Sequence, residues 1–170
     1  MGNVDVNQLV VALIQQLQGA PNLSSGIGGY VKSKLPSLSG KLKDWPFFKM
    51  QLKDFYSLNT LDVVDKIATA NITINKNHEI FKGHFPGNPI TPGVCMMQII
   101  KELTEEVVGE KLMMQSSSNI KFMAIINPEK TPNLELNLDI TKTDEGYKVK
   151  NNTKFEDTVA LKLTTNFIIK

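Results

Sequence analysis

The most constraining feature of this chain is the run from Gly83 to Gln98, which concentrates residues that restrict the backbone. It reads Gly-His-Phe-Pro-Gly-Asn-Pro-Ile-Thr-Pro-Gly-Val-Cys-Met-Met-Gln. Its three glycines allow backbone conformations that other residues resist, and its three prolines fix φ and remove amide donors. We therefore predict a rigid loop that aims His84, one of only two histidines in the chain, in a definite direction.

A long apolar helix is predicted to follow this loop. Thr91 can cap amides two or three residues further on, and Pro92 suits the first helical position. The stretch from Val94 to Val108 supplies the apolar body, and Gly109 ends it. This is the one long central helix that the pattern predicts.

Alternation of apolar and polar residues predicts strands on both sides of the helix. One strand is expected at Ile67–Ile74, and later ones at residues 119–126, 134–141, 147–155 and 159–169. Asp144-Glu145-Gly146 and Glu156-Asp157 have the composition of hairpin turns. One buried helix followed by consecutive antiparallel strands indicates an α+β fold in which the sheet wraps around the helix.

The N-terminal part, residues 1–49, is predicted to be separate from the domain at residues 50–170. Apolar residues from Val6 to Gln18 follow helical spacing, and residues 19–46 have the composition of a flexible linker. The apolar cluster Trp45-Pro46-Phe47-Phe48 must be buried on the domain or on a partner. An added docking segment, an extended reading frame and a weakly packed tail all remain open for this part.

Composition limits the classes of partner. A chain of 170 residues that is 41% hydrophobic can form one domain with an ordinary core. Its 19 basic and 17 acidic residues are scattered, with a net charge of +2, so no nucleic-acid partner is expected. One cysteine, Cys95, cannot form an internal disulfide framework. With no signal peptide and no membrane span predicted, we expect a cytoplasmic protein.

One segment resembles the active-site segment of the hotdog-fold 3-hydroxyacyl-acyl-carrier-protein dehydratases of fatty acid synthesis. It has the order His84-Phe85-Pro86-Gly87, then Pro89, then Pro92-Gly93-Val94, where an apolar helix begins. The resemblance is specific from Glu79 to about Leu103 and extends by pattern from about Met50 to Lys170. It implies a hotdog domain, an antiparallel sheet around one long helix, in residues 50–170. It also implies two protomers, identical or homologous, with active sites at their interface.

The resemblance implies a role for each matching residue. Dehydration of a 3-hydroxyacyl thioester needs a base for the C2 proton and donors for the thioester oxygen. His84 is the expected base, the Gly93 amide the expected carbonyl donor, and Phe85 and Val94 the expected substrate contacts. The alternative for His84 is a structural role in which it hydrogen-bonds only its own loop. His78 has no such context and is expected to be a surface loop residue.

Gln98 departs from the family pattern, in which a carboxylate lies at this position. A neutral amide can donate a hydrogen bond to the leaving hydroxyl but cannot give up a proton. Glu102 lies four residues later, on the same helix face and roughly 6 Å away along the axis. Many family members carry a carboxylate and then a glutamine at these two positions, so this chain resembles the swapped order. Either Glu102 supplies the acid, directly or through Gln98 and a water, or the site binds acyl chains without efficient dehydration. In the alternative, Glu102 belongs to one solvated charged face with Lys101, Glu105 and Glu106.

Three functions remain in view. The first is a dehydratase-like enzyme that acts on acyl thioesters carried on acyl carrier protein, in fatty acid or polyene-type lipid synthesis. The second is a non-catalytic acyl-binding subunit, as half of a heterodimer with an active homologue, and the third is an acyl thioesterase of the same fold. No metal site is expected, because the two histidines have neither further cysteines nor paired carboxylates at ligand spacing. No organic cofactor is implied.

Overall fold

The computed structural model describes residues 52–85 and 87–170, which form six strands and two helices. The helix predicted over Val6–Gln18, the linker and the cluster Trp45–Phe48 lie outside the described residues. The strands are β1 (Tyr56–Val64), β2 (Ile67–Ile74), β3 (Leu112–Phe122), β4 (Asn133–Lys142), β5 (Gly146–Phe155) and β6 (Thr158–Ile169). The helices are α4 (Ile80–Gly83) and α5 (Gly93–Val108).

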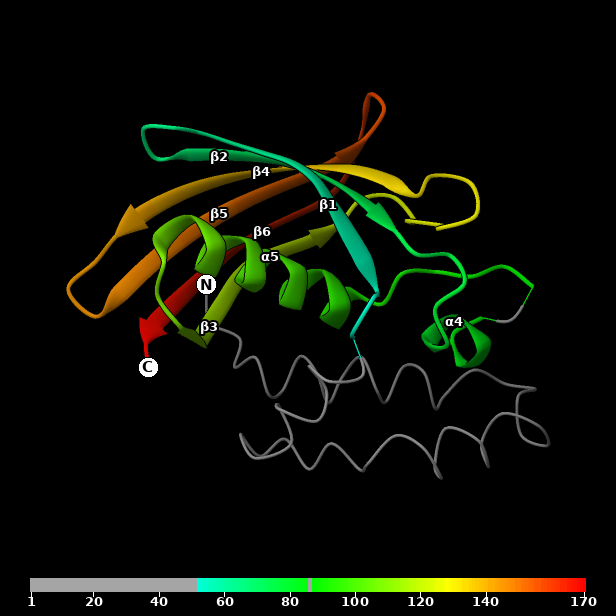
Figure 1. The fold of residues 1–170 in the computed structure, drawn as a ribbon, viewed down its shortest axis with the longest axis horizontal. Helices are drawn as coiled ribbons and strands as arrows, with labels where there is room; N and C mark the ends of the chain where they lie inside the picture. The colour runs from blue at the N-terminus through cyan, green and yellow to red at the C-terminus, as the bar shows by residue number, and fades with distance from the viewer. Residues whose placement is uncertain (1–51, 86) are drawn as a thin grey trace.

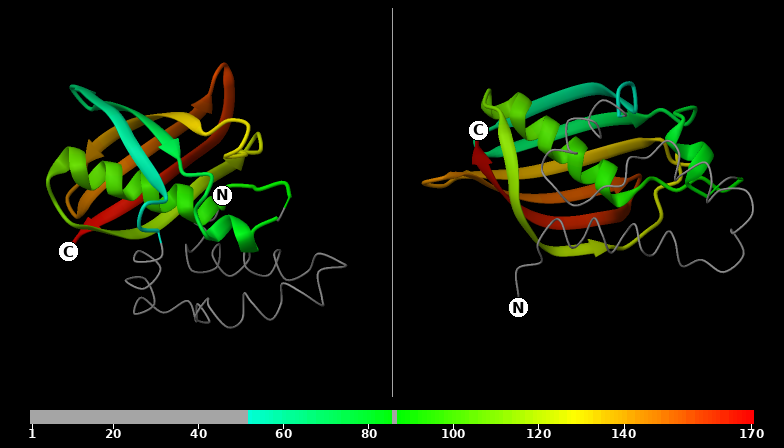
Figure 2. Two further views of the ribbon diagram at one scale, coloured as in Figure 1. Left: turned by 45° about the vertical axis from the view of Figure 1, so that its right-hand side comes forward. Right: turned by 90° about the horizontal axis from the view of Figure 1, so that it is seen from below.

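The strands form one antiparallel sheet that curves around α5. Their order is β1-β2-β4-β5-β6-β3, so β1 and β3 are the two edges. Helix α5 lies along the concave side of the sheet, as the predicted arrangement requires (Figure 1). The short helix α4 lies beyond one end of the sheet, in the connection from β2 to α5 (Figure 2).

The core lies between the sheet and α5. Alternate residues of β2 and β4 are fully buried, and the helix contributes a matching apolar set: Met96, Met97, Ile99, Ile100 and Leu103. Burial of each such large apolar side chain stabilises the fold by about 1.5–3 kcal/mol. The central helix is therefore held by the hydrophobic effect rather than by its intrinsic helix propensity.

Four of the predicted strands are confirmed. β2 has the predicted bounds, and β4, β5 and β6 differ from them by at most one residue at each end. The end of α5 is also confirmed: Gly109 adopts φ 72° and its amide donates to the Glu105 carbonyl. The strand β1 and the short helix α4 were not predicted.

The bounds predicted for the third strand were wrong. That strand was expected at residues 119–126, and β3 spans Leu112–Phe122 instead. It is an edge strand with irregular pairing between Met114 and Ser116 and between Ser118 and Lys121. Each irregularity changes which face the following side chains occupy, so the apolar alternation of an ordinary strand is lost.

The predicted cap of α5 was also wrong. The N-cap position is Pro92, which has no side chain able to cap, and its carbonyl accepts from the amides of Cys95 and Met96 at 3.0 and 3.3 Å. Thr91 lies one residue outside the helix, where its amide donates to the Ile126 carbonyl at 2.8 Å. Its buried hydroxyl has no hydrogen-bond partner in the described part of the chain.

The solvated charged face that was the alternative for Glu102 is not present. Lys101 and Glu105 are 5% and 7% exposed and form an ion pair, while Glu106 is exposed. Glu105 also accepts from the Leu112 amide at 2.8 Å. Burial alone would raise the pKa of Glu105, but that bond, the bond from Lys101 and the charge of Lys111 together lower the pKa. This cluster ties the end of α5 to the start of β3.

Candidate active site

His84 follows α4 in a loop that folds back on itself. Its Nδ1 lies 2.6 Å from the carbonyl oxygen of Ile90, three residues before α5 begins. A carbonyl only accepts, so Nδ1 carries the hydrogen and Nε2 of the neutral ring keeps its lone pair. This bond from His84 to its own loop therefore leaves Nε2 as the basic nitrogen. The structural alternative for His84 predicts the same bond.

The imidazole of His84 is half-buried. This burial lowers its pKa from the usual value, and the hydrogen bond to Ile90 opposes the shift without reversing it. The ring is therefore neutral at pH 7, which is the form a general base requires.

Phe85 lies directly against this ring. The two ring centroids are 4.9 Å apart and the planes meet at 89°, so the contact is edge to face. Phe85 is 42% exposed, and its φ of 58° lies in the left-handed region that bulky residues rarely adopt. Such strain persists only where the surrounding loop imposes it.

The N-terminus of α5 lies at the other end of the same loop. Gly93 is buried, and a Cβ built on it would lie 2.5 Å from Cζ of Phe122, so a larger residue would require the Phe122 ring to move. The amides of Gly93 and Val94 have no carbonyl one turn earlier in the helix to bond to. Together with the positive end of the helix dipole, these amides suit a carbonyl oxygen as ligand. Val94 is partly buried against the core.

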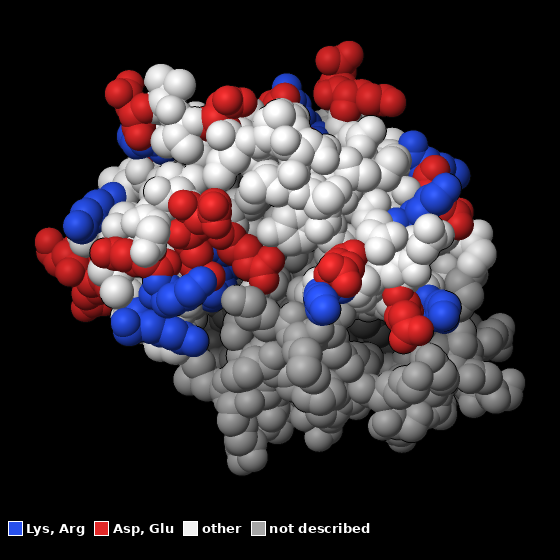
Figure 3. All heavy atoms as spheres, in the orientation of Figure 1, with Lys and Arg blue, Asp and Glu red and all other residues white. Residues whose placement is uncertain are grey.

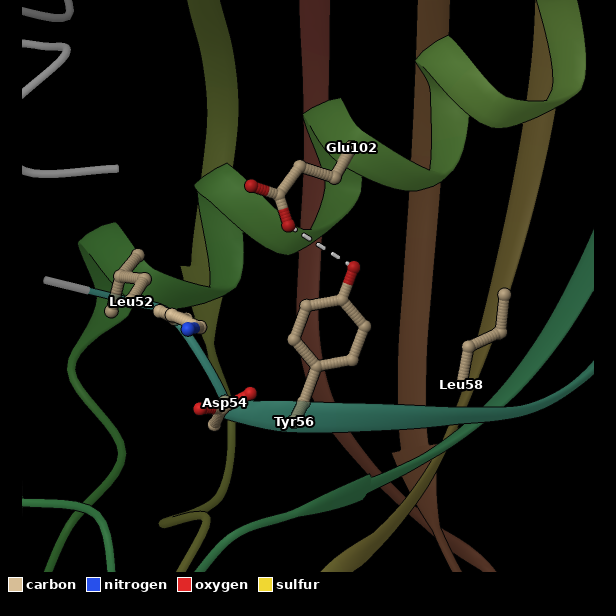
Figure 4. A pocket seen from close by; sticks show the side chains of 6 residues that line it. Leu52, Asp54, Tyr56, Leu58 and Glu102 are labelled. Atoms are coloured by element: carbon tan, nitrogen blue, oxygen red, sulfur yellow. Dashed lines mark hydrogen bonds between the residues drawn. The ribbon is translucent and has the colours of Figure 1, made fainter. Parts of the chain in front are cut away.

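Gln98 and Glu102 meet on adjacent turns of α5. Gln98 Nε2 donates to Glu102 Oε1 at 2.7 Å. The other carboxylate oxygen, Oε2, accepts from the hydroxyl of Tyr56 on β1 at 3.1 Å. Figure 4 shows Tyr56 pointing from its strand toward Glu102 on the helix. Both carboxylate oxygens are therefore engaged by neutral donors.

A pocket lies beside Tyr56 and Glu102, whereas Gln98 is fully buried and does not line it. It has a volume of about 460 Å³ and is lined by Leu52, Lys53, Asp54, Tyr56, Leu58 and Glu102. Burial, and after it the charge of Glu102 and the hydrogen bond to it, raise the pKa of Tyr56. The phenol thus stays protonated and remains a donor to Glu102.

The structure brings the expected residues together in two groups. His84 contacts Phe85 in one, and Gln98 bonds to Glu102 in the other, while no hydrogen bond joins the groups within the described residues of a single chain. Tyr56 was missed by sequence reasoning. It lies 46 residues from Glu102, in a strand with mostly exposed positions and no motif, so no local signal could identify it.

His78 and Cys95 have structural surroundings. His78 lies in the predicted loop but is half-buried: Nδ1 accepts from the Ile80 amide and Nε2 lies 3.2 Å from the Lys53 carbonyl. It therefore supports the start of α4. Cys95 is fully buried, which raises the pKa of its thiol, so this thiol is not an activated nucleophile.

Residues 52–85 and 87–170 contain no group of three or more His, Cys, Asp or Glu placed to hold a metal ion. No helix in this part of the chain is long and apolar enough to span a membrane. Acidic and basic side chains are interspersed over the described surface that Figure 3 shows, without a large area of one sign.

Comparison with known proteins identifies the family and the fold. The family model described as ApeI-like, ApeI dehydratase, matches residues 61–161. The 3-hydroxyacyl-[acyl-carrier-protein] dehydratase FabZ of Lactobacillus helveticus is 30% identical over 128 residues, covering 67% of this chain and 84% of that protein. FabZ of Lactococcus lactis is 34% identical over 100 residues, covering 51% of this chain and 64% of that protein.

A solved structure shares the fold. The dehydratase heterocomplex ApeI:P from Xenorhabdus doucetiae superposes with a TM-score of 0.58 at 16% identity, covering 66% of this chain and 96% of that one. The predicted hotdog fold and the predicted family resemblance are confirmed.

Proposed function

This chain belongs to the ApeI-like dehydratase family, and from that premise we propose that it removes water from 3-hydroxyacyl thioesters. The acyl chain would be carried on acyl carrier protein, in cytoplasmic fatty acid or polyene-type lipid synthesis. The observation that carries the proposal is His84, a neutral imidazole whose Nδ1–H is held by the Ile90 carbonyl. Its Nε2 is the base that the reaction needs.

The first half of the reaction uses the loop and the helix N-terminus. His84 Nε2 takes the C2 proton, and the electrons of that C–H bond form the C2–C3 double bond as the C3–O bond breaks. The Gly93 amide donates to the thioester oxygen, where negative charge develops. Gly93 suits this role because its amide has no intrahelical acceptor.

We assign the return of the proton to His84 as well. Glu102 accepts hydrogen bonds through both of its oxygens, which supports a positioning role rather than that of the acid. The imidazolium of His84 then gives its proton to the departing hydroxide, water leaves, and the ring is neutral again. A site without a separate acid loses about 10²- to 10⁴-fold in rate, so slow turnover is expected.

We propose that a second protomer completes the site at the β3 edge. Among the described strands β3 pairs only with β6, and Phe122, Met123 and Ile125 near its end are 50%, 58% and 61% exposed. Phe122 adjoins Gly93, so this apolar patch continues from the helix N-terminus. Pairing at this edge would cover the patch.

The assay that tests the proposal mixes the protein with a 3-hydroxyacyl thioester and follows enoyl absorbance and free thiol separately. We expect enoyl product from the natural chain and none above background from His84→Ala. The matched control is His78→Ala, which removes the other histidine and is expected to lower thermal stability but to keep turnover. Turnover that persists in His84→Ala rules out His84 as the base.

Gln98→Glu tests the missing acid. The new carboxyl would lie beside Glu102, and two carboxylates so close share a proton, which raises the pKa of one of them and makes it an acid. We expect kcat to rise, by up to about 10²-fold. The double variant Gln98→Glu/Glu102→Gln restores the order usual in the family and should show a similar gain. An unchanged or lower rate in Gln98→Glu would instead favour Glu102 as the working acid.

The second candidate is an acyl-binding subunit that pairs with an active homologue. Two observations favour it: Gln98 is a neutral residue where an acid is expected, and the solved ApeI:P structure is a heterocomplex. In this case the same assay yields neither product from the chain alone, although the thioester binds. Release of free thiol without enoyl product would instead indicate a thioesterase.

A further inference from the structure

Gln98 is fully buried, and its two polar atoms have different surroundings. Its Nε2 donates to Glu102, whereas its Oε1 is buried without a hydrogen-bond partner among the described residues. Proteins rarely leave a buried acceptor unpaired, and such an atom is often completed by water or by a ligand. The carbonyl of Gln98 is thus the one polar atom of this side chain that the described part of the chain leaves unpaired.

Glu102 determines which way the amide faces. An ionised carboxylate only accepts hydrogen bonds, so the Gln98 atom 2.7 Å from it must be the NH₂ group. If the amide turned over, two acceptor oxygens would face each other at hydrogen-bond distance. The orientation of Gln98 therefore depends on Glu102 staying in place.

Tyr56 in turn holds Glu102 in place. Glu102 is only partly buried and, with Tyr56, lines the pocket between β1 and α5 (Figure 4). The Tyr56 hydroxyl reaches from β1 to Oε2 of Glu102 at 3.1 Å. Without this donor, the carboxylate would keep only the bond from Gln98, within the same helix.

We infer that Tyr56 is a positioning residue that acts through Glu102 to hold the Gln98 carbonyl toward the bound acyl chain, and that this carbonyl selects ligands with a hydroxyl at C3. The inference rests on the ligand class of the proposed function.

A carbonyl oxygen recognises hydrogen-bond donors. The C3 hydroxyl of a 3-hydroxyacyl thioester is a donor, whereas a saturated chain and the enoyl product have none at C3. A site built to bond a substrate hydroxyl discriminates strongly against an analogue that lacks it, because its own buried group is then left unpaired. The same carbonyl would therefore favour binding of substrate and release of product.

The test compares the dissociation constants of 3-hydroxyoctanoyl pantetheine, both enantiomers, and octanoyl pantetheine by calorimetry. We expect the natural chain to prefer the hydroxylated thioester by roughly ten-fold. Tyr56→Phe should reduce that preference by about two- to ten-fold, at most to its complete loss, which is roughly the equivalent of one hydrogen bond, with little change for the octanoyl thioester.

Tyr147→Phe is the matched control. The Tyr147 hydroxyl on β5 donates to Glu110 Oε2 at 2.9 Å, also in a partly buried setting. This variant loses a tyrosine–glutamate hydrogen bond of the same kind and should keep the full preference. Thermal unfolding shows whether each variant folds. If Tyr56→Phe does not fold, Glu102→Ala tests the same link and should reduce the preference likewise.

Two results overturn the inference: equal affinity of the natural chain for both thioesters, or an unchanged preference in the folded Tyr56→Phe or Glu102→Ala variant. Enoyl formation is measured separately and distinguishes the two proposals. A hydroxyl preference that falls in Tyr56→Phe, without turnover by the natural chain, contradicts dehydration but supports the role of Tyr56. Turnover without a preference supports dehydration and rejects that role.

Discussion

At the scale of single residues, hydrogen bonds to side chains define the chemistry of this site. The Ile90 carbonyl fixes the tautomer of His84, and Glu102 fixes the orientation of Gln98. Each of these bonds assigns one side-chain atom to the protein, and the other is the atom that we propose for a ligand. Residue type alone does not give these assignments, because an imidazole or an amide can face either way.

The lowered pKa of His84 predicts how kcat/KM falls at acidic pH. A protonated imidazole cannot act as base, so kcat/KM should fall as pH drops, with a midpoint below the usual 6.5. Stability should change in the same direction: below about pH 6.5 the unfolded chain takes up the proton before the folded one, so the free energy of unfolding declines. Rate profiles and denaturant unfolding between about pH 5 and 8 check both. An acid limb centred above 6.5 would contradict the role of burial.

At the scale of elements, the Glu105 cluster fixes the helix relative to the sheet edge. Glu105 lies in the last turn of α5 and accepts from Lys101 and from the amide of Leu112, the first residue of β3. The strand therefore starts at a fixed place beside the helix. Because β3 also carries Phe122, which contacts Gly93, the cluster supports the far end of the site.

Glu105→Gln should lower the free energy of unfolding by roughly 1.5–3 kcal/mol, because hydrogen bonds to a charged group are lost. The control is Glu106→Gln, an exposed neighbour, expected to change stability by less than about 0.5 kcal/mol. Since the pKa of Glu105 is lowered in the fold, its contribution is present above the pKa of the unfolded chain and is lost as pH falls below it. The difference between the two variants should therefore shrink in acid, as measured by urea unfolding.

The elements differ in how far sequence could predict them. β2 and β4 lie inside the sheet with one face buried, so their alternation is regular and their bounds were predicted well. β1 is exposed at most positions and β3 is irregular, and neither shows the period of two on which the prediction depends. At the site, the His84 loop is a local motif, whereas the bond from Tyr56 to Glu102 joins residues distant in sequence.

At the scale of the whole molecule, the two edges of the sheet differ. The β3 end carries Phe122, Met123 and Ile125 beside the N-terminus of α5 and is the edge we propose for pairing. If the site needs a second protomer, assembly and turnover must be lost together.

Ile125→Lys tests this link. A buried lysine at the interface would be desolvated without a partner, so we expect sedimentation velocity to show monomers and the enoyl assay to lose activity. Val64→Lys is the matched control, since Val64 is 70% exposed at the opposite edge, and it should change neither measurement. Dissociation caused by Val64→Lys instead would place the interface at β1.

The irregular pairing of β1 with β2 would also limit the size of the assembly that we propose. The register shifts between Leu58 and Thr60, and charged Asp62 and Asp65 follow at the exposed end of the strand. Bulges and charges of this kind keep an open edge from adding another strand. If two sheets joined through β3, the two β1 strands would be the outer edges of the combined sheet. Neither edge would accept a further strand, so the assembly would stop at two protomers and would not polymerise.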